Sequence, residues 1–181
     1  MRYTHYILFA LFVFSATGLA AQRYEIGLKT STLRDFDVLL KKQTKDGDFL
    51  RLRLFTSQIL FQAGNERDRL TANFRLALGK EKRVSLSDRF QFLHGWSPGI
   101  GVSYTTTLNV NLLTVNPFVG YILGVQYGFS PTFAVGLEAI PSAGIFVTSG
   151  TGGVSSLGAR LNASDSNVAI FAVARFERNK K

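Results

Sequence analysis

The sequence contains no cysteine and very little histidine. The absence of cysteine excludes a disulfide framework, thiolate chemistry and a lipid-anchored cysteine. Of the two histidines, His5 lies near the N-terminus and His94 is the only one in the rest of the chain. A single histidine without cysteine makes no recognisable set of metal ligands. We therefore expect the protein to hold no metal and to use no cofactor.

The chain also lacks an apolar run long enough for a spanning helix. Its most apolar stretch, residues 6–16, follows the basic Arg2 and precedes the small residues 18–21. This order is typical of a secretory signal peptide. A buried N-terminal helix is the alternative, but it fits poorly with the small-residue end. We predict a cleaved signal peptide over residues 1–21 and one domain over residues 22–181.

The excess of positive charge does not indicate a nucleic-acid partner. The net charge is +9, and export would separate the protein from nucleic acid. The sequence also has no run of Lys and Arg interleaved with base-stacking aromatics. Many charges instead gather beside apolar segments, at 41–46, 80–83 and 177–181. Charges outside an apolar band are what a membrane barrel needs, because a cation on the lipid face at the midplane costs about 2–4 kcal/mol.

What the sequence does contain is a series of segments in which apolar and polar residues alternate. In 133–140 the odd positions are apolar, and Glu138 lies on the other side. Successive strand side chains point to opposite faces, so such a segment has one apolar face and one polar face. The pattern and the turn residues predict eight strands, at about 23–29, 34–43, 48–61, 69–84, 88–106, 112–129, 132–149 and 157–177. An even number of strands returns both termini to one side, the periplasmic side.

The first strand is predicted to end at a connection formed by residues 30–32, and Asp46-Gly47 marks a hairpin turn. The predicted outward face is apolar and includes Ile26, Leu52 and Leu137, whereas the opposite face is charged. A soluble barrel would reverse these faces. We therefore predict an all-β fold, an eight-stranded antiparallel up-and-down transmembrane β-barrel in a bacterial outer membrane.

The inward charges form the most distinctive set of residues. Eight strands leave an interior just wide enough to be filled by side chains. A buried charge must be paired, because removing one partner costs about 3–5 kcal/mol. The predicted lumen ion-pair network places four arginines opposite three carboxylates: Arg51, Arg53, Arg75 and Arg175 with Glu25, Asp37 and Glu138. We favour a plug of ion pairs that locks the barrel, and a small gated pore is the alternative.

Four segments have a familiar pattern: 33–42, 49–54, 82–90 and 117–131. They resemble the small outer-membrane β-barrel proteins of Bacteroidota-type bacteria. The resemblance implies an outer-membrane barrel, and it brings no catalytic residues with it. Because lipid A deacylases and palmitoyltransferases are built on such barrels, His94 must be considered as a catalytic residue. A triad needs a serine and a carboxylate in reach of the histidine, but alternation puts Ser97 on the other face from His94.

We therefore predict no catalytic, cofactor or metal residues, and a non-enzymatic barrel with a structural or surface-interaction role. The alternatives are an outer-membrane lipid-modifying hydrolase that uses His94, a small pore, or a soluble lipocalin-like barrel. The inward arginines argue against the last of these. The expected partners are outer-membrane lipid, the outer-membrane assembly machinery during biogenesis and another envelope protein. We expect a monomer that binds no nucleic acid.

Overall fold

The computed structural model describes residues 23–177, apart from 33–34, 63–68, 108–109, 152–154 and 163–167. The predicted signal peptide and the last four residues lie outside the described residues. Among the described residues, no helix is long and apolar enough to span a membrane. They are strands joined by short connections, as the alternating pattern predicts.

The structure divides into ten strand segments, which form the eight predicted strands. Their bounds are β1 (Arg23–Thr32), β2 (Asp35–Gln43), β3 (Phe49–Gln62), β4 (Arg69–Ser85), β5 (Phe90–Thr107), β6 (Val110–Ser130), β7 (Phe133–Ala139), β8 (Ser142–Gly150), β9 (Ser155–Asn162) and β10 (Val168–Glu177). The pairs β7–β8 and β9–β10 each correspond to one predicted strand. The break between β7 and β8 falls at Ile140 and Pro141, and proline has no backbone N–H for the ladder.

The first predicted connection is wrong. Residues 30–32 belong to β1, and Thr32 pairs with Asp35 of β2 across a register shift. Threonine is β-branched and suits a strand, and this preference extends β1 beyond the predicted end. The predicted Asp46-Gly47 turn is confirmed, since Gly47 has φ of 85° and its N–H donates to the Thr44 carbonyl over 3.2 Å.

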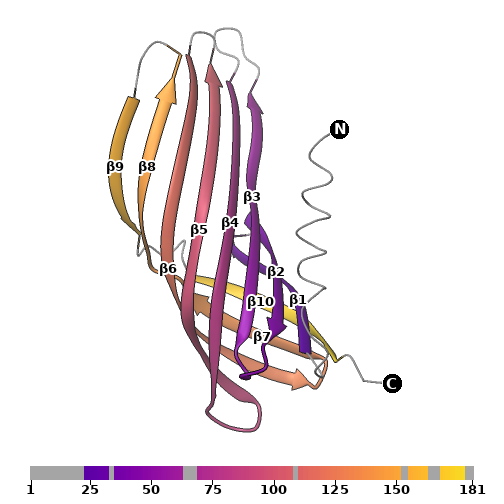
Figure 1. The fold of residues 1–181 in the computed structure, drawn as a ribbon. Coiled ribbons are helices and arrows are strands. Elements are labelled where there is room, and N and C mark those ends of the chain that lie inside the picture. Colours follow the sequence, from indigo (N-terminus) through magenta and orange to yellow (C-terminus); the bar gives the residue numbers. More distant parts are fainter. Residues whose placement is uncertain are drawn as a thin grey trace.

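The strands close into an antiparallel barrel. The ring runs β5-β4-β3-β2-β1-β10-β7-β6, and it closes where β6 pairs with β5. The N-terminal β1 and the C-terminal β10 are neighbours, with Glu25 opposite Arg175 and Lys29 opposite Phe171. Both described ends of the chain therefore lie at the same end of the barrel (Figure 1). The eight-stranded fold is confirmed.

The barrel wall is taller on one side than on the other. β8, β9 and the adjoining ends of β3, β4, β5 and β6 rise beyond the ends of β1, β2, β7 and β10 (Figure 1). We refer to this part as the upper wall. Within the described part of the chain, β9 pairs only with β8, and residues 56–62 of β3 pair only with β4. The upper wall is therefore an open, curved sheet standing on a closed ring.

The two faces of the barrel are inverted relative to a soluble protein. Apolar side chains such as Ile26, Leu28 and Leu137 face outward and are about half exposed, whereas Glu25, Arg51 and Glu138 are buried inside. Exposed apolar residues around a closed sheet are suited to lipid. The ring strands β1, β2 and β10 have 10, 9 and 10 residues, about the length of a tilted spanning strand, and β3 to β6 are longer. The predicted assignment of the faces holds for these residues.

Candidate functional site: the charged lumen

The lumen carboxylate nearest the chain termini is that of Glu25 on β1. Arg83 of β4 donates two hydrogen bonds to it, over 2.8 and 2.7 Å, and Arg175 of β10 donates a third over 3.1 Å. The Arg83 guanidinium also lies 3.5 Å from the ring centroid of Phe49. The three charged side chains join β1, β4 and β10 inside the barrel.

The next carboxylate, Glu81 of β4, is fully buried and contacts three cations. Lys41 donates to it over 2.7 and 3.0 Å, Arg83 over 2.9 Å and Arg51 over 3.2 Å. Arg83 therefore connects Glu81 to Glu25. Hydrogen bonds that involve ionised groups on both sides are the strong class in a low-dielectric interior.

The third carboxylate, Glu138 of β7, is reached from the opposite side of the ring. Arg51 of β3 donates one guanidinium N–H to each carboxylate oxygen, over 2.6 and 2.5 Å. Lys29 of β1 lies 2.7 Å from the same carboxylate. Since β3 and β7 are four strands apart in a ring of eight, the Arg51–Glu138 pair crosses the lumen.

The remaining predicted residues lie closer to the upper wall. Asp37 Oδ2 is 3.9 Å from Arg53 Nε, which is a loose ion pair. Arg75 occupies the same hydrogen-bonded row as Asp37, two strands away, and its side chain lies across Gly101. The structure therefore brings Glu25 and Arg175 together, Arg51 and Glu138 together, and Asp37 close to Arg53.

Sequence reasoning missed four members of this network: Lys29, Lys41, Glu81 and Arg83. Alternation places Lys29 and Lys41 on the inward face, but they were not assigned partners. Glu81 and Arg83 were grouped with the charges that flank a strand. In the structure, β4 continues to Ser85, and Ala77, Gly79, Glu81 and Arg83 share the inward face. The alternation, counted on through the charged stretch, is the signal that could have identified them.

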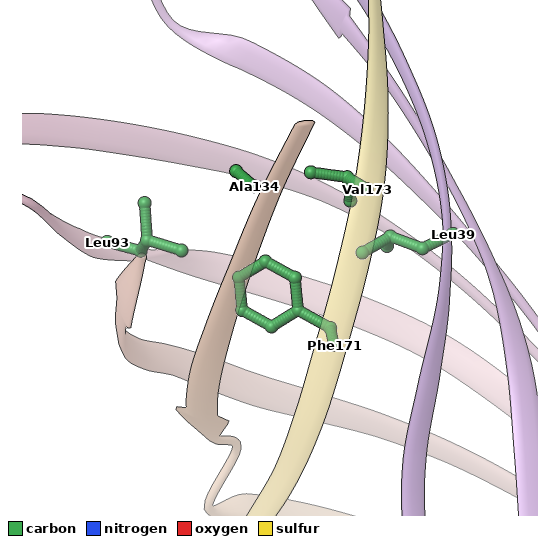
Figure 2. Close-up of a cluster of buried hydrophobic side chains, with 5 residues drawn as sticks. All are labelled: Leu39, Leu93, Ala134, Phe171 and Val173. Carbon is green, nitrogen blue, oxygen red and sulfur yellow. The ribbon is translucent and has the colours of Figure 1, made fainter. Parts of the chain in front are cut away.

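The lumen also has an apolar side. Leu39, Leu93, Ala134, Phe171 and Val173 form a buried cluster (Figure 2). Lys41 connects the two sides, because its ammonium lies 4.8 Å from the centroid of the Phe171 ring. The described contacts of the lumen thus include six cations and four carboxylates. These described ion pairs carry an excess of positive charge.

His94 lies on the outward face of β5, away from this network. Among the described residues its hydrogen-bond partner is the Tyr121 hydroxyl, 3.4 Å from Nδ1, and the Phe92 ring stacks on it at 5.8 Å. Ser97 is buried on the inward face. The carboxylate of Asp48, in the turn after β2, is held by Lys80 at 2.8 Å, and this hydrogen bond keeps the pKa of Asp48 below its ordinary value. In the part of the chain that the structure describes, the hydrogen-bond partner of His94 is thus a tyrosine hydroxyl, and no serine–histidine–carboxylate triad is formed.

The described residues contain no group of three or more His, Asp or Glu that is arranged to hold a metal ion. The charged side chains of the lumen act on the strands through ion pairs and packing. Arg–carboxylate pairs connect strands that are far apart in the ring, and a buried cluster of aromatic and aliphatic side chains lies beside them. Such pairs link strands on opposite sides of the ring.

Comparison with solved structures identifies similar barrels. A major outer membrane protein from Thermus thermophilus is similar over 87% of this chain and 100% of that chain, with 12% identity and a TM-score of 0.54. Ail, the attachment invasion locus protein of Yersinia pestis, is similar over 87% and 100%, with 12% identity and a TM-score of 0.45. Neisserial surface protein A is similar over 85% and 90%, with 12% identity and a TM-score of 0.40.

No protein-family model and no curated protein sequence matches the chain. The similarity to the Thermus protein shows the fold of an outer-membrane β-barrel. That fold and the outward apolar face together support the predicted location in a bacterial outer membrane.

Proposed function

We propose that this protein is a non-enzymatic outer-membrane barrel with a closed lumen and a structural or surface-interaction role. The ion pairs of the lumen act as a plug that holds the strands together, and the upper wall carries any interaction with the surroundings. We further propose that the termini and the short turns after β2, β4 and β6 face the periplasm. The upper wall then faces the cell exterior.

The observation that carries this proposal is the Arg51–Glu138 pair. It joins opposite strands through two hydrogen bonds, and Glu81 and Lys29 extend it toward the neighbouring strands. Breaking such a pair leaves a buried charge without compensation, at a cost of about 3–5 kcal/mol. An ion crossing the barrel would have to separate these groups.

The proposed partners follow from the same geometry. Outer-membrane lipid contacts the outward apolar face, and the assembly machinery inserts the barrel. The protein acts as a monomer, and another envelope protein is a partner for the upper wall. That the protein belongs to the barrel family of Bacteroidota-type bacteria remains a prediction.

Planar-bilayer recording tests the closed lumen. We expect no steady conductance from the wild type under conditions in which a known open barrel conducts. The same recording on Glu138→Gln, together with its unfolding by urea, separates a plug from a pore. Steady conductance of the wild type, with little loss of stability in Glu138→Gln, contradicts the plug.

Orientation is tested separately, because the chain has no cysteine of its own. Thr151→Cys places a thiol in the exposed turn after β8, on the upper wall, and Lys45→Cys places one in the exposed turn after β2. A membrane-impermeant maleimide applied to intact cells should label the first variant and leave the second unlabelled until the outer membrane is permeabilised. The reverse pattern contradicts the proposed orientation.

A further inference from the structure

His94 belongs to a group of side chains on the outward face of β4, β5 and β6. His94 lies opposite Lys82 of β4, and Trp96 lies opposite Tyr121 of β6. We call these four residues the outer cluster. The turn that joins β4 to β5 lies at the same end of the barrel as the described ends of β1 and β10 (Figure 1). The outer cluster is therefore on the part of the wall away from the upper wall.

Aromatic contacts hold the imidazole of His94 in one orientation. The Tyr121 hydroxyl lies 3.4 Å from His94 Nδ1, and the Phe92 ring stacks on the imidazole at 5.8 Å. Trp96 packs edge-on against Tyr121, with ring centroids 4.8 Å apart. When the Tyr121 hydroxyl donates to Nδ1, the proton of the neutral imidazole is on Nε2. His94 then has an N–H donor that the hydrogen bond to Tyr121 does not use.

Two glycines let β4 and β5 lie close together at this height. A Cβ atom at Gly95 would collide with the carbonyl oxygen of Lys80, and a Cβ atom at Gly79 would lie 2.8 Å from the carbonyl oxygen of Trp96. Directly opposite residues of antiparallel strands have Cβ atoms about 4.5–5.5 Å apart. Lys82 and His94 are such a pair, so one anionic group can contact both side chains.

Lys82 is the cation of the outer cluster. Its side chain is exposed, and among the described residues no carboxylate forms an ion pair with it. Lys80, two residues away on the same face, is paired with Asp48 at 2.8 Å. The charge of Asp48 is therefore already met by a lysine, and Lys82 is left to face an anion from outside the chain.

The outward face of β4 changes from apolar to charged beside the outer cluster. Phe74 and Leu78 are exposed apolar side chains, and the next outward residue after Leu78 is Lys80. A lysine is costly on the lipid face at the midplane but not close to the interface, where Trp and Tyr are enriched. Trp96, which is 60% exposed, lies at this boundary opposite Lys80. The outer cluster is therefore at the level of the lipid headgroups.

We propose that the outer cluster binds the phosphate of an anionic phospholipid, with Lys82 supplying the positive charge and His94 Nε2 donating a hydrogen bond. Trp96 and Tyr121 pack against the glycerol region, as amphipathic rings do at this level of a membrane. A choline lipid carries its own cation beside the phosphate, so it competes less well for Lys82. The inference deepens the proposed lipid contact of the outward face, and it rests on the proposed function for the leaflet, which is the periplasmic one.

Trp96 provides the measurement, because it is the only tryptophan of the chain and belongs to the outer cluster. The mature chain is inserted into vesicles of mixed phosphatidylcholine and phosphatidylglycerol, in which one lipid or the other carries brominated acyl chains that quench tryptophan fluorescence. The two quenching series give the relative association of the two lipids next to Trp96. We expect the wild type to favour phosphatidylglycerol about fivefold, the effect of one cation beside an anionic headgroup.

Lys82→Gln should reduce this preference to nearly equal association, and His94→Ala should lower it by removing the donor. Lys45→Gln is the matched control, because Lys45 is an exposed lysine in the turn after β2, outside the outer cluster. It removes the same charge and should keep the preference. Heat-modifiable migration on a gel verifies that each variant is folded. If His94→Ala does not fold, Lys82→Gln at its exposed position provides the test alone.

Equal association of the two lipids with the wild type overturns the lipid site, as does a preference that survives in both folded variants or falls equally in Lys45→Gln. Loss of the preference on addition of inorganic phosphate at constant ionic strength also overturns it, because the cluster then binds a soluble anion. Both leaflets of the vesicles have the same lipids, so the result depends neither on orientation nor on the lumen. A wrong orientation or a conducting lumen leaves the preference intact, and an absent preference leaves the plug standing.

Discussion

Arg51 and Glu138 are 87 residues apart in the sequence, and they join opposite sides of the barrel through two parallel hydrogen bonds. The same guanidinium lies 3.2 Å from Glu81, and Glu138 also contacts Lys29 at 2.7 Å. One pair therefore links β1, β3, β4 and β7. An eight-stranded barrel has no separate core, so contacts of this kind fix the distance between strands that share no backbone hydrogen bonds.

We expect Glu138→Gln to lower the free energy of unfolding by about 3–5 kcal/mol, because Arg51 and Lys29 lose the charge that compensates them. The single tryptophan, Trp96, is on the outward face and reports insertion into lipid by its fluorescence. Urea titration of the barrel in lipid vesicles gives the stability.

Glu177→Gln is the control for this variant, because Glu177 pairs with Arg23 at an exposed position. Exposed pairs contribute about 0–1 kcal/mol, so this variant should unfold close to the wild type. Equal effects of the two substitutions would mean that the lumen is as well solvated as the surface.

Glu81→Gln should be at least as destabilising as Glu138→Gln, because Glu81 contacts Lys41, Arg51 and Arg83. Its sequence neighbour Lys82 points outward and is exposed, so Lys82→Gln should change the stability by less than about 0.5 kcal/mol. The two substituted residues are neighbours in the sequence, but one side chain faces the lumen and the other faces outward. A similar urea midpoint for both would contradict the assignment of Glu81 to the lumen.

Leu52→Arg should destabilise the barrel by about 2–4 kcal/mol, because Leu52 faces lipid although both of its neighbours are inward arginines. Ser103→Arg, on the concave face of β5, provides the inward comparison and should be better tolerated. Folding into lipid vesicles under urea measures both. Equal tolerance at the two sites would reverse our assignment of the faces.

His94→Ala should leave the lipid composition of the outer membrane unchanged, since the described hydrogen-bond partner of His94 is the Tyr121 hydroxyl and not a serine or a carboxylate of a triad. Mass spectrometry of lipid A from cells that express the wild type or the variant is the measurement. Ser97→Ala is the companion variant. Gain or loss of an acyl chain that follows either substitution would establish an enzyme.

The strand content and the direction of each face could be predicted from local sequence. The alternation in 133–140 identifies Leu137 as outward and Glu138 as inward, because side chains of a strand alternate between faces whatever the partner strand is. The predicted connection at residues 30–32 was wrong because threonines occur both in strands and in turns. The tertiary pairing with β2 decided in favour of a strand.

The partners of the inward charges depended on the tertiary structure. Alternation indicates that Arg51 and Glu138 face inward, but it contains no information about which strands lie opposite each other or at which height. Strand order and register set both, and the register of a closed barrel depends on all eight strands together. For the same reason Glu81, read from the sequence as a charge flanking a strand, became the most highly connected carboxylate of the lumen.

The sequence alone determined that this chain forms strands with a lipid-facing and a charged face, because a period of two is a local property of the backbone. Only the tertiary structure decided which charges meet and how the upper wall extends beyond the ring. Those relationships join residues through register and curvature, and neither quantity can be read from the alternation within a single strand.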